Sequence, residues 1–175
     1  MNKPRRFLLR VILPGALVLL MIVAGGYAAG FRYNFSQSMP VGIWRVVSGK
    51  PQRGDYVLVN IPDTPIFQTA HARGYIRAGF AANGLAPLIK RLAAVEGDVV
   101  AVGETVTINA QEWPKSHVYE RDPDGRALPR AESGTVQAGF VWVLSDYNAG
   151  SFDSRYFGPL PVSAIQAKVQ PVWIW

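Results

Sequence analysis

Two serines separated by a single residue, Ser36 and Ser38, lie in the stretch NFSQSMPVGIW, just after a long apolar run. If this stretch is extended, as Pro40 and Gly42 favour by opposing a helix, both hydroxyls point to the same side. A serine hydroxyl attacks a carbonyl only when a base removes its proton, and a neighbouring hydroxyl can stabilise the developing oxyanion. The pair is therefore either a nucleophile with its oxyanion donor or part of an ordinary polar linker.

Lys90 is the candidate base for such a serine. In a strand formed by LIKRLAAV, Lys90 shares one face with Leu88 and Leu92, while Arg91 lies on the other face. Each face then carries one cation among apolar neighbours. One interpretation is that the packed face is the Arg91 side, or that Lys90 reaches solvent from the strand end, and in both cases Lys90 stays charged. The other is that burial lowers its pKa and leaves a neutral amine that can accept the proton.

Histidine and cysteine chemistry has little support in the sequence. There is no cysteine, and His71 and His117 are the only histidines. Counting leaves a Ser-His-Asp triad open, but no Gly-x-Ser-x-Gly elbow occurs and neither histidine lies near an acidic cluster. We interpret both as surface residues and expect no metal or cofactor.

A third polar cluster lies in SDYNAGSFDSRYFGPLP, residues 145–161. Ser151, Asp153 and Arg155 alternate, so an extended chain would place them on one side, with Asp153 and Arg155 spaced for a salt bridge. A turn rich in Ser, Asp, Asn and Gly would have the same composition. Taken alone, this cluster does not decide between a site and a turn.

The apolar run that precedes the serines is long enough to cross a membrane. Residues 11–30 contain no charge, and such a run can span the hydrocarbon layer as a helix. The basic residues before it predict a cytoplasmic segment 1–10 and an extracytoplasmic domain 31–175. The alternative is a cleaved signal peptide with its cleavage site near Gly26-Tyr27-Ala28.

The segment 31–175 is predicted to be mainly β. Short β-rich runs such as GIWRVV, DYVLVNI, VVAV, TVTI and FVWVLSD are separated by turns, and the chain closes with AIQAKVQPVWIW. Between them, 62–87 is a long loop with one predicted helix over 66–73. Trp173 and Trp175, with Trp44, are either membrane-interface residues or packed strand residues.

The charge distribution argues against nucleic-acid binding. The net charge is +6, but Lys3, Arg5, Arg6 and Arg10 supply four of the 18 basic residues, which leaves 14 basic against 12 acidic residues in the rest of the chain. No basic and aromatic stripe follows, as a nucleic-acid interface would need.

In this order and behind this anchor, three stretches resemble the boxes of the signal peptidase I superfamily. SQSMPVG resembles the nucleophile box, IKRLAAVEGDVV the lysine box and SDYNAGSFDSRYFGPLP the final box. Within the superfamily, the stretches RGYIRAGF, NGLAPLIKR and SFDSRYFGP are most similar to the TraF-type conjugative transfer signal peptidases. Ala81 and Ala82 stand where members often have Cys-Pro.

The resemblance implies a Ser/Lys dyad. Ser38 would be the nucleophile and Lys90 the general base, with the Ser36 hydroxyl and the Ser38 N–H as the oxyanion hole. Ser151 would orient the Lys90 amine. The implied reaction is acyl-enzyme formation at Ser38, followed by hydrolysis or by capture by the substrate's own N-terminal amine, which would cyclise it.

The remaining expectations also follow from the resemblance. Asp153 and Arg155 would brace the site, and no cofactor or metal is needed. The fold would be a signal-peptidase-like antiparallel β domain whose catalytic face lies close to the bacterial inner membrane, on the periplasmic side. The substrate would be a membrane-associated pilin precursor, in contact with a conjugative transfer apparatus. The rival functions are a general signal peptidase I and a non-catalytic scaffold of a conjugation or secretion apparatus.

Overall fold

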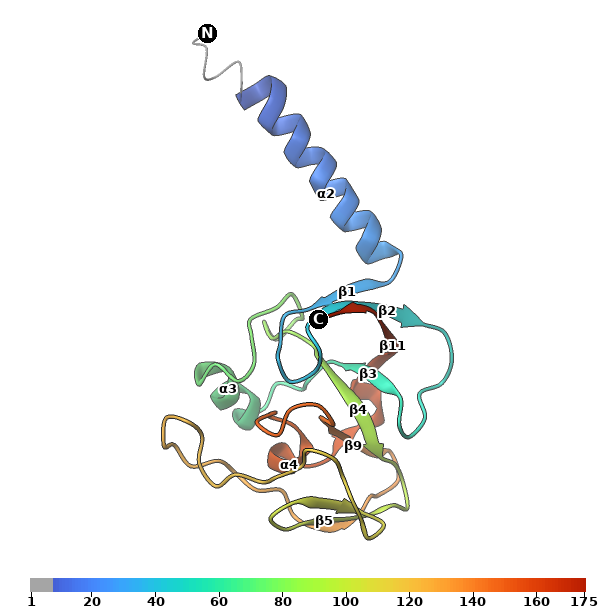
Figure 1. Cartoon of the computed structure of the whole chain (residues 1–175), viewed down its shortest axis with the longest axis vertical. Helices are drawn as coiled ribbons and strands as arrows, with labels where there is room; N and C mark the ends of the chain where they lie inside the picture. Colours follow the sequence, from blue (N-terminus) through green and yellow to red (C-terminus); the bar gives the residue numbers. More distant parts are fainter. Residues whose placement is uncertain (1–7) are drawn as a thin grey trace.

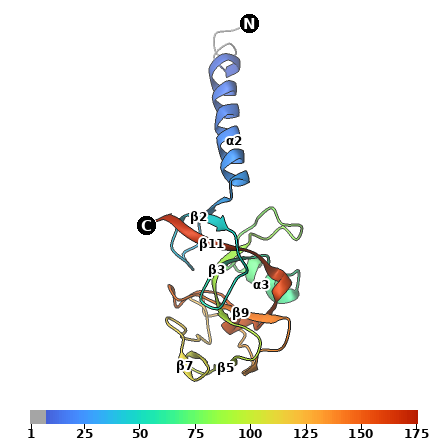
Figure 2. The same cartoon turned by 90° about the vertical axis from the view of Figure 1, so that its right-hand side faces the viewer.

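A long apolar helix stands apart from a β domain (Figures 1 and 2). The structure is a computed structural model that describes residues 8–175, so most of the predicted basic segment 1–10 lies outside the described residues. A turn of π-helix, η1 (Leu8–Ile12), runs into α2 (Leu13–Ala28). The span Arg10–Ala28 has a mean hydropathy of 2.2 and none of it is buried. The predicted N-terminal apolar helix is therefore confirmed, and its 19 residues suffice to cross a bilayer.

A seven-stranded antiparallel sheet carries the β domain. Its order is β1-β2-β11-β3-β4-β9-β10. The strands are β1 (Phe31–Asn34), β2 (Gly42–Val47), β3 (Tyr56–Val59), β4 (Leu88–Ala94), β9 (Phe140–Leu144), β10 (Leu160–Pro161) and β11 (Ile165–Ile174). The C-terminal strand β11 inserts between β2 and β3, so the last residues return to the end of the domain where α2 joins β1 (Figure 1).

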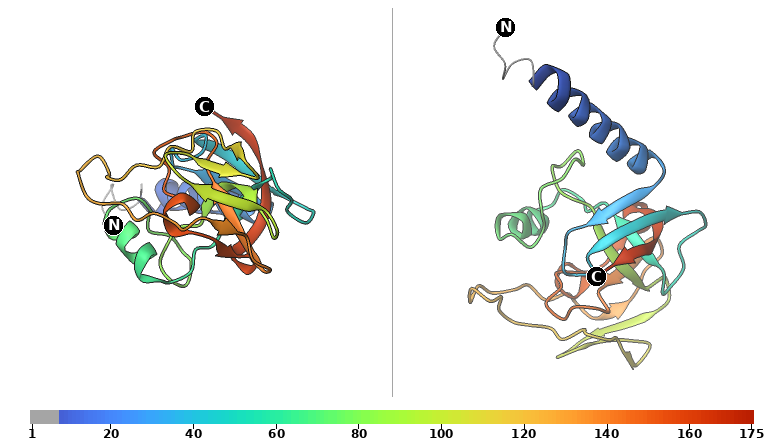
Figure 3. Two further views of the ribbon diagram at one scale, coloured as in Figure 1. Left: turned by 90° about the horizontal axis from the view of Figure 1, so that it is seen from below. Right: turned by 45° about the horizontal axis from the view of Figure 1, so that its top comes forward.

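A smaller sheet of order β7-β6-β5-β8 covers the end of the domain farthest from α2 (Figures 2 and 3). Its strands are β5 (Val99–Val102), β6 (Val106–Ile108), β7 (Gln111–Glu112) and β8 (Gly134–Thr135). The helices are α3 (Pro65–Ala72) and α4 (Ser154–Phe157), with the 3-10 turn η2 (Val162–Ala164). The predicted mainly β fold is confirmed. The predicted helix 66–73 is present as α3, shifted by one residue toward the N-terminus at both ends.

Strand β4 is covered on both faces, which decides the environment of Lys90. Leu92 packs in one core cluster with residues of β3, β9 and α3, whereas Ala93 and Ala94 pack in a second cluster against the small sheet. Ile89 belongs to a third cluster with Met39 and Trp44. A strand with two packed faces leaves its central polar side chains little access to water.

Trp44 is a packed strand residue, which is one of the two alternatives left open by the sequence. Its side chain is fully buried in the third cluster, where Nε1 donates to the Pro40 carbonyl at 3.1 Å. It therefore cannot lie at a membrane interface. Trp173 and Trp175, at the end of β11, are 69% and 62% exposed, so they are not packed strand residues.

Candidate active site

Ser36 and Ser38 lie on a turn between β1 and β2, which we call the nucleophile turn (residues 34–40). Their hydroxyl oxygens are 2.9 Å apart. The predicted proximity is confirmed, but the expected extended backbone is wrong, because the chain turns at Gln37 and Ser38. The turn brings the hydroxyls together more closely than alternation along a strand would.

Asn34 explains why the chain turns here. The Asn34 Oδ1 accepts from the Ser36 N–H at 3.0 Å, and its Nδ2 donates to the carbonyls of Ser36, Met39 and Pro40 at 2.9–3.0 Å. One buried amide thus bridges both ends of the turn, as asparagine side chains commonly do. Our sequence reasoning missed Asn34, although an asparagine two residues before Ser36 is itself a turn signal.

The nucleophile turn is held against the strand that carries Lys90. The hydroxyl of Ser145 donates to the Ser38 carbonyl at 2.6 Å, and Asn148 Nδ2 donates to the Gln37 carbonyl at 3.1 Å. Ser145 directly follows Leu144, which pairs with Arg91 across β9 and β4. Both contacts are made to backbone carbonyls of the turn, so within residues 8–175 the Ser38 hydroxyl keeps only its contact with the Ser36 hydroxyl.

Lys90 is buried in the middle of the sheet. It is 1% exposed and pairs with Val57 on β3. Its Nζ donates to the Ser151 hydroxyl oxygen at 2.6 Å. Burial lowers the pKa of Lys90 from 10.5 to about 8, with the Asp153 carboxylate opposing the shift and the Arg155 guanidinium reinforcing it. The alternative of a lysine reaching solvent from the strand end is therefore wrong.

Arg91 lies on the opposite face of β4 from Lys90, and its side chain is partly exposed. Its Nε forms an ion pair with Asp146 Oδ2 at 2.7 Å, and its guanidinium lies over the Tyr56 ring, 3.9 Å from the centroid. The two adjacent basic residues thus lie in different environments. Arg91 is partly exposed and paired with Asp146, whereas Lys90 is buried and hydrogen-bonded to the neutral Ser151.

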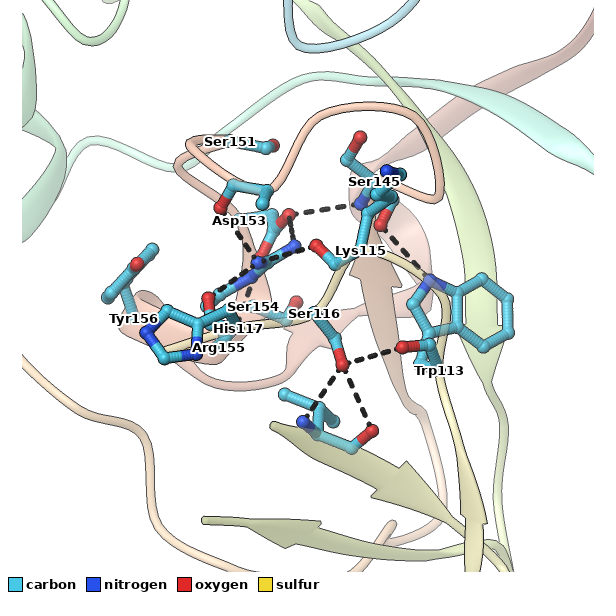
Figure 4. A network of polar contacts seen from close by, with 12 residues as sticks. Trp113, Lys115, Ser116, His117, Ser145, Ser151, Asp153, Ser154, Arg155 and Tyr156 are labelled. Atoms are coloured by element: carbon cyan, nitrogen blue, oxygen red, sulfur yellow. Dashed lines mark hydrogen bonds and ion pairs between the residues drawn. The ribbon is translucent and has the colours of Figure 1, made fainter. Parts of the chain in front are cut away.

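Asp153 and Arg155 form a fully buried ion pair behind the site (Figure 4). Arg155 Nε and Nη2 contact the two carboxylate oxygens of Asp153 at 2.7 and 2.9 Å. Nη1 donates to the carbonyls of Lys115, His117 and Ala149 at 2.9–3.0 Å. The predicted salt bridge is confirmed. The expected extended backbone is wrong, because Asp153 caps the N-terminus of α4 and accepts from the Arg155 N–H.

This ion pair has a consequence for Lys90. The second Asp153 oxygen also accepts from the Ser145 N–H at 3.0 Å, so the carboxylate is fully occupied. None of the ion pairs formed within residues 8–175 includes Lys90. A buried ammonium without a counter-ion is unfavourable, so Lys90 loses its proton at a lower pH than an exposed lysine does.

The Ser38 hydroxyl and the Lys90 amine are each hydrogen-bonded to a different serine. Ser38 contacts Ser36, and Lys90 contacts Ser151; no hydrogen bond within the described chain joins Ser38 directly to Lys90. A cleft of about 660 Å³ opens over Ser36, Ser38 and Ser151, with Phe152 and Tyr156 in its wall. Catalytic hydrogen bonds are often long before substrate binds, so this arrangement fits a resting site.

The histidines lie apart from this cleft. His71 is half-buried, and its Nδ1 contacts the Ile76 carbonyl at 2.9 Å, whereas His117 is exposed. Neither lines the cleft. Over residues 8–175, no group of three His, Cys, Asp or Glu side chains is placed to hold a metal ion.

Comparison with known proteins gives matches over nearly the whole chain. Residues 5–175 match the family model described as signal peptidase, peptidase S26. Plasmid transfer protein TraF of Escherichia coli is 40% identical over 174 residues, covering 98% of this chain and 97% of the relative. Conjugal transfer protein TraF of Agrobacterium tumefaciens (strain 15955) is 38% identical over 172 residues, or 97% and 96% of the two chains. The crystal structure of a signal peptidase I from Enterococcus faecalis is 22% identical with a TM-score of 0.41, covering 70% of this chain and 98% of that one.

Proposed function

The chain belongs to the signal peptidase family, peptidase S26, and from that premise we propose that it is a membrane-anchored serine endopeptidase with Ser38 as nucleophile and Lys90 as general base. One observation carries the proposal: a buried lysine without an ion pair, whose pKa is lowered to about 8, is hydrogen-bonded to Ser151, which lines the same cleft as Ser36 and Ser38. A non-catalytic scaffold has no use for a buried cation of this kind, because its burial destabilises the fold.

The reaction begins when the hydrogen bond between the Ser38 and Ser36 hydroxyls breaks. The Ser38 hydroxyl then gives its proton to neutral Lys90 as its oxygen attacks the scissile carbonyl. The oxyanion then accepts hydrogen bonds from the Ser36 hydroxyl and the Ser38 N–H. These two donors already converge, since the Ser38 N–H donates to Ser36 Oγ at 3.2 Å. The substrate oxygen replaces that mutual contact without a change in the backbone.

Collapse of the tetrahedral intermediate needs an acid. Protonated Lys90 gives its proton to the leaving amine, which leaves the acyl group on Ser38 as an ester. Ser151 supports both steps, because its oxygen accepts from the amine and fixes the direction of the Nζ. Lys90, neutral again, then activates either water or an incoming amine.

We infer that the substrate is the pilin precursor of a conjugative transfer system. The support is the sequence similarity over nearly full length to proteins named for plasmid and conjugal transfer. If the substrate's own N-terminal amine captures the acyl group, the product is cyclic and lighter than the linear cleaved chain by one water. A general signal peptidase would instead cut many unrelated exported precursors.

We place the domain on the periplasmic face of the inner membrane, anchored by α2 with its N-terminus in the cytoplasm. Exposed aromatic residues support a contact between the anchored end of the domain and the membrane. Phe35, Trp173 and Trp175 are 62–69% exposed, and the Trp175 ring lies 5.8 Å from Tyr33 on β1, the strand that follows the anchor. Aromatic side chains at the anchored end favour the headgroup layer.

Brominated lipids test this contact in the full chain reconstituted into vesicles. We expect them to quench its tryptophan fluorescence, and Trp173→Phe combined with Trp175→Phe to remove that quenching. Of the other three tryptophans, Trp44 and Trp142 are buried, and Trp113 is half-buried against the core cluster of the small sheet, at the end of the domain farthest from α2. Unchanged quenching in the double variant would contradict the membrane contact.

The proposed activity is tested by co-expressing the pilin precursor with the full chain. We expect Ser38→Ala and Lys90→Ala to leave the precursor uncut. Matched controls are Ser48→Ala and Lys50→Ala, which change an exposed serine and an exposed lysine outside the catalytic cleft. Continued cleavage in either dyad variant would overturn the assignment. A panel of unrelated signal-peptide substrates distinguishes the general peptidase, which would cut most of them.

A further inference from the structure

Part of the wall of the catalytic cleft is a polar hairpin, residues 119–128, which we call the wall hairpin. It lines the cleft through Tyr119, Arg121, Asp122, Pro123 and Leu128. Arg121 and Ala127 form an antiparallel bridge, and the Leu128 N–H donates to the Glu120 carbonyl at 2.9 Å. In Figures 1 and 3 this gold-brown loop lies on the side of the domain away from α2.

Asp122 fixes the shape of the wall hairpin. Its carboxylate accepts from the backbone N–H groups of Asp124 and Arg126 at 3.0 and 2.8 Å, from Arg126 Nε at 2.5 Å and from the Tyr75 hydroxyl. These contacts occupy both oxygens and neutralise the charge. Asp122 is therefore a structural group that gives the cleft no net negative charge.

Arg121 is the other charged side chain that lines the cleft, and it lacks a carboxylate partner among residues 8–175. It is exposed, and its Nη1 donates only to the Gly125 carbonyl at 2.7 Å, within the same hairpin. A guanidinium has five donors, so most of its hydrogen-bonding capacity faces the cleft or solvent. The remaining lining is neutral.

The lining of the cleft also has an aromatic part. Phe152 and Tyr156 stack with ring centroids 5.6 Å apart, and Tyr75 lies 5.3 Å from Phe152. The Tyr156 hydroxyl oxygen accepts from the Tyr119 N–H at 3.2 Å and so attaches the hairpin to α4. The cleft thus combines aromatic contact surface with one cation that has no carboxylate partner among residues 8–175.

We propose that Arg121 binds a carboxylate of the leaving peptide. This inference rests on the proposed function, in which Lys90 returns its proton to the leaving amine. The Lys90 partner Ser151 lines this cleft, and we therefore place the leaving peptide in it. Arginine pairs with carboxylates through two parallel hydrogen bonds. The carboxylate is either an Asp or Glu side chain of the leaving peptide or its C-terminus.

A binding experiment with short peptides tests the subsite without catalysis. The full chain in detergent micelles is titrated with tetra-alanine bearing a free C-terminus, with tetra-alanine amide, and with Ala-Glu-Ala-Ala amide, using saturation-transfer NMR. We expect at least one carboxylate peptide to bind about tenfold more tightly than tetra-alanine amide. The peptide that does so identifies the source of the carboxylate.

Arg121→Gln should remove this preference, and Arg121→Lys should retain part of it. The matched control is Arg130→Gln, because Arg130 is also exposed and also donates to a backbone carbonyl, that of Gly103, but lies outside the cleft. Equal binding of the three peptides to the wild-type chain would overturn the proposal, as would a preference that persists in Arg121→Gln.

Kinetics give the second readout and separate this inference from the proposed function. With the precursor as substrate, we expect Arg121→Gln to raise KM by about tenfold and to change kcat by less than about twofold, since the contact exists before and during reaction. If the wild-type chain does not cut the precursor, the proposed function fails and the peptide titration alone decides the subsite. If it cuts and Arg121→Gln has wild-type kinetics, the subsite is wrong.

Discussion

The lowered pKa of Lys90 favours catalysis at neutral pH but reduces the stability of the fold. With a pKa of about 8, Lys90 is neutral in about one tenth of molecules at pH 7, some 300-fold more than a lysine at its ordinary pKa. We therefore expect kcat/KM to rise about tenfold per pH unit up to about pH 8 and to level off above it.

The same shift destabilises the fold. The unfolded chain binds the Lys90 proton up to about pH 10.5, whereas the folded chain releases it near pH 8. Stability must therefore increase between these values, and below pH 8 the full penalty applies, about 3 kcal/mol. Replacing the amine by an apolar chain in Lys90→Met removes that penalty.

We expect Lys90→Met to be more stable than the wild type at pH 7 by about 2–3 kcal/mol, or about 4–12 °C in Tm. The difference should shrink as the pH rises from 8 to 10.5. Circular dichroism melts of the full chain in detergent, at half-unit pH steps, measure this directly. The cleavage rate of the wild type over the same steps gives the catalytic half of the prediction.

Two results would refute this reasoning. A rate that is flat with pH, or that inflects near pH 10.5, would mean that Lys90 is not the depressed base. A Lys90→Met variant with no gain in stability, or with a gain that does not change with pH, would mean that the lysine is solvated in the folded state. The control variant is Lys50→Met, which replaces an exposed lysine. We expect it to lose stability by an amount that does not change with pH.

Three further predictions concern the surroundings of the site. Ser151→Ala removes the hydroxyl 2.6 Å from Lys90 Nζ, and we expect kcat/KM to fall about 10- to 100-fold in a steady-state cleavage assay, with no change in Tm beyond a few degrees. Arg155→Met leaves the buried Asp153 carboxylate unpaired, so we expect denaturant unfolding to show a loss of about 3–5 kcal/mol; a variant as stable as the wild type would contradict the buried pair. Ala110 has a φ of +64° in the β6–β7 hairpin, and Ala110→Gly should stabilise the domain by about 0.5–1 kcal/mol in the same assay, since glycine adopts this conformation without strain.

The order and type of the elements could largely be predicted because they depend on local pattern. An uncharged run of helical length gives α2, and alternating β-rich runs with short turns give the antiparallel sheets. The β6–β7 hairpin turns at Asn109 and Ala110, which both have positive φ values, and asparagine is a common residue in such turns. These features need no knowledge of what packs against them.

The burial of Lys90 could not be decided from β4 alone. Alternation distinguishes two faces only when one of them is exposed, and here separate core clusters cover both. The environment of Lys90 depends on Ser151, Asp153 and Arg155, which are more than sixty residues away and share no local pattern with it.

Asn34, Ser145 and Arg121 were missed for a related reason. Asn34 and Ser145 act on the backbone of the nucleophile turn, and a residue that works through backbone contacts has no required partner type in the sequence. Arg121 lies in RDPDGRALPRAESG, which has the composition of any polar loop. Only its place in the lining of the cleft that also contains Ser38 distinguishes it from the other exposed arginines.

Covalent trapping of the substrate on Ser38 tests the central claim most directly. The full chain is mixed with precursor, quenched in acid within the first turnover, digested and analysed by mass spectrometry. The account predicts that the wild-type chain carries an acyl adduct on Ser38, with Ser36 of the same peptide unmodified. It predicts no adduct in Lys90→Met. An adduct on another residue, or cleavage at the wild-type rate by Ser38→Ala, would contradict it.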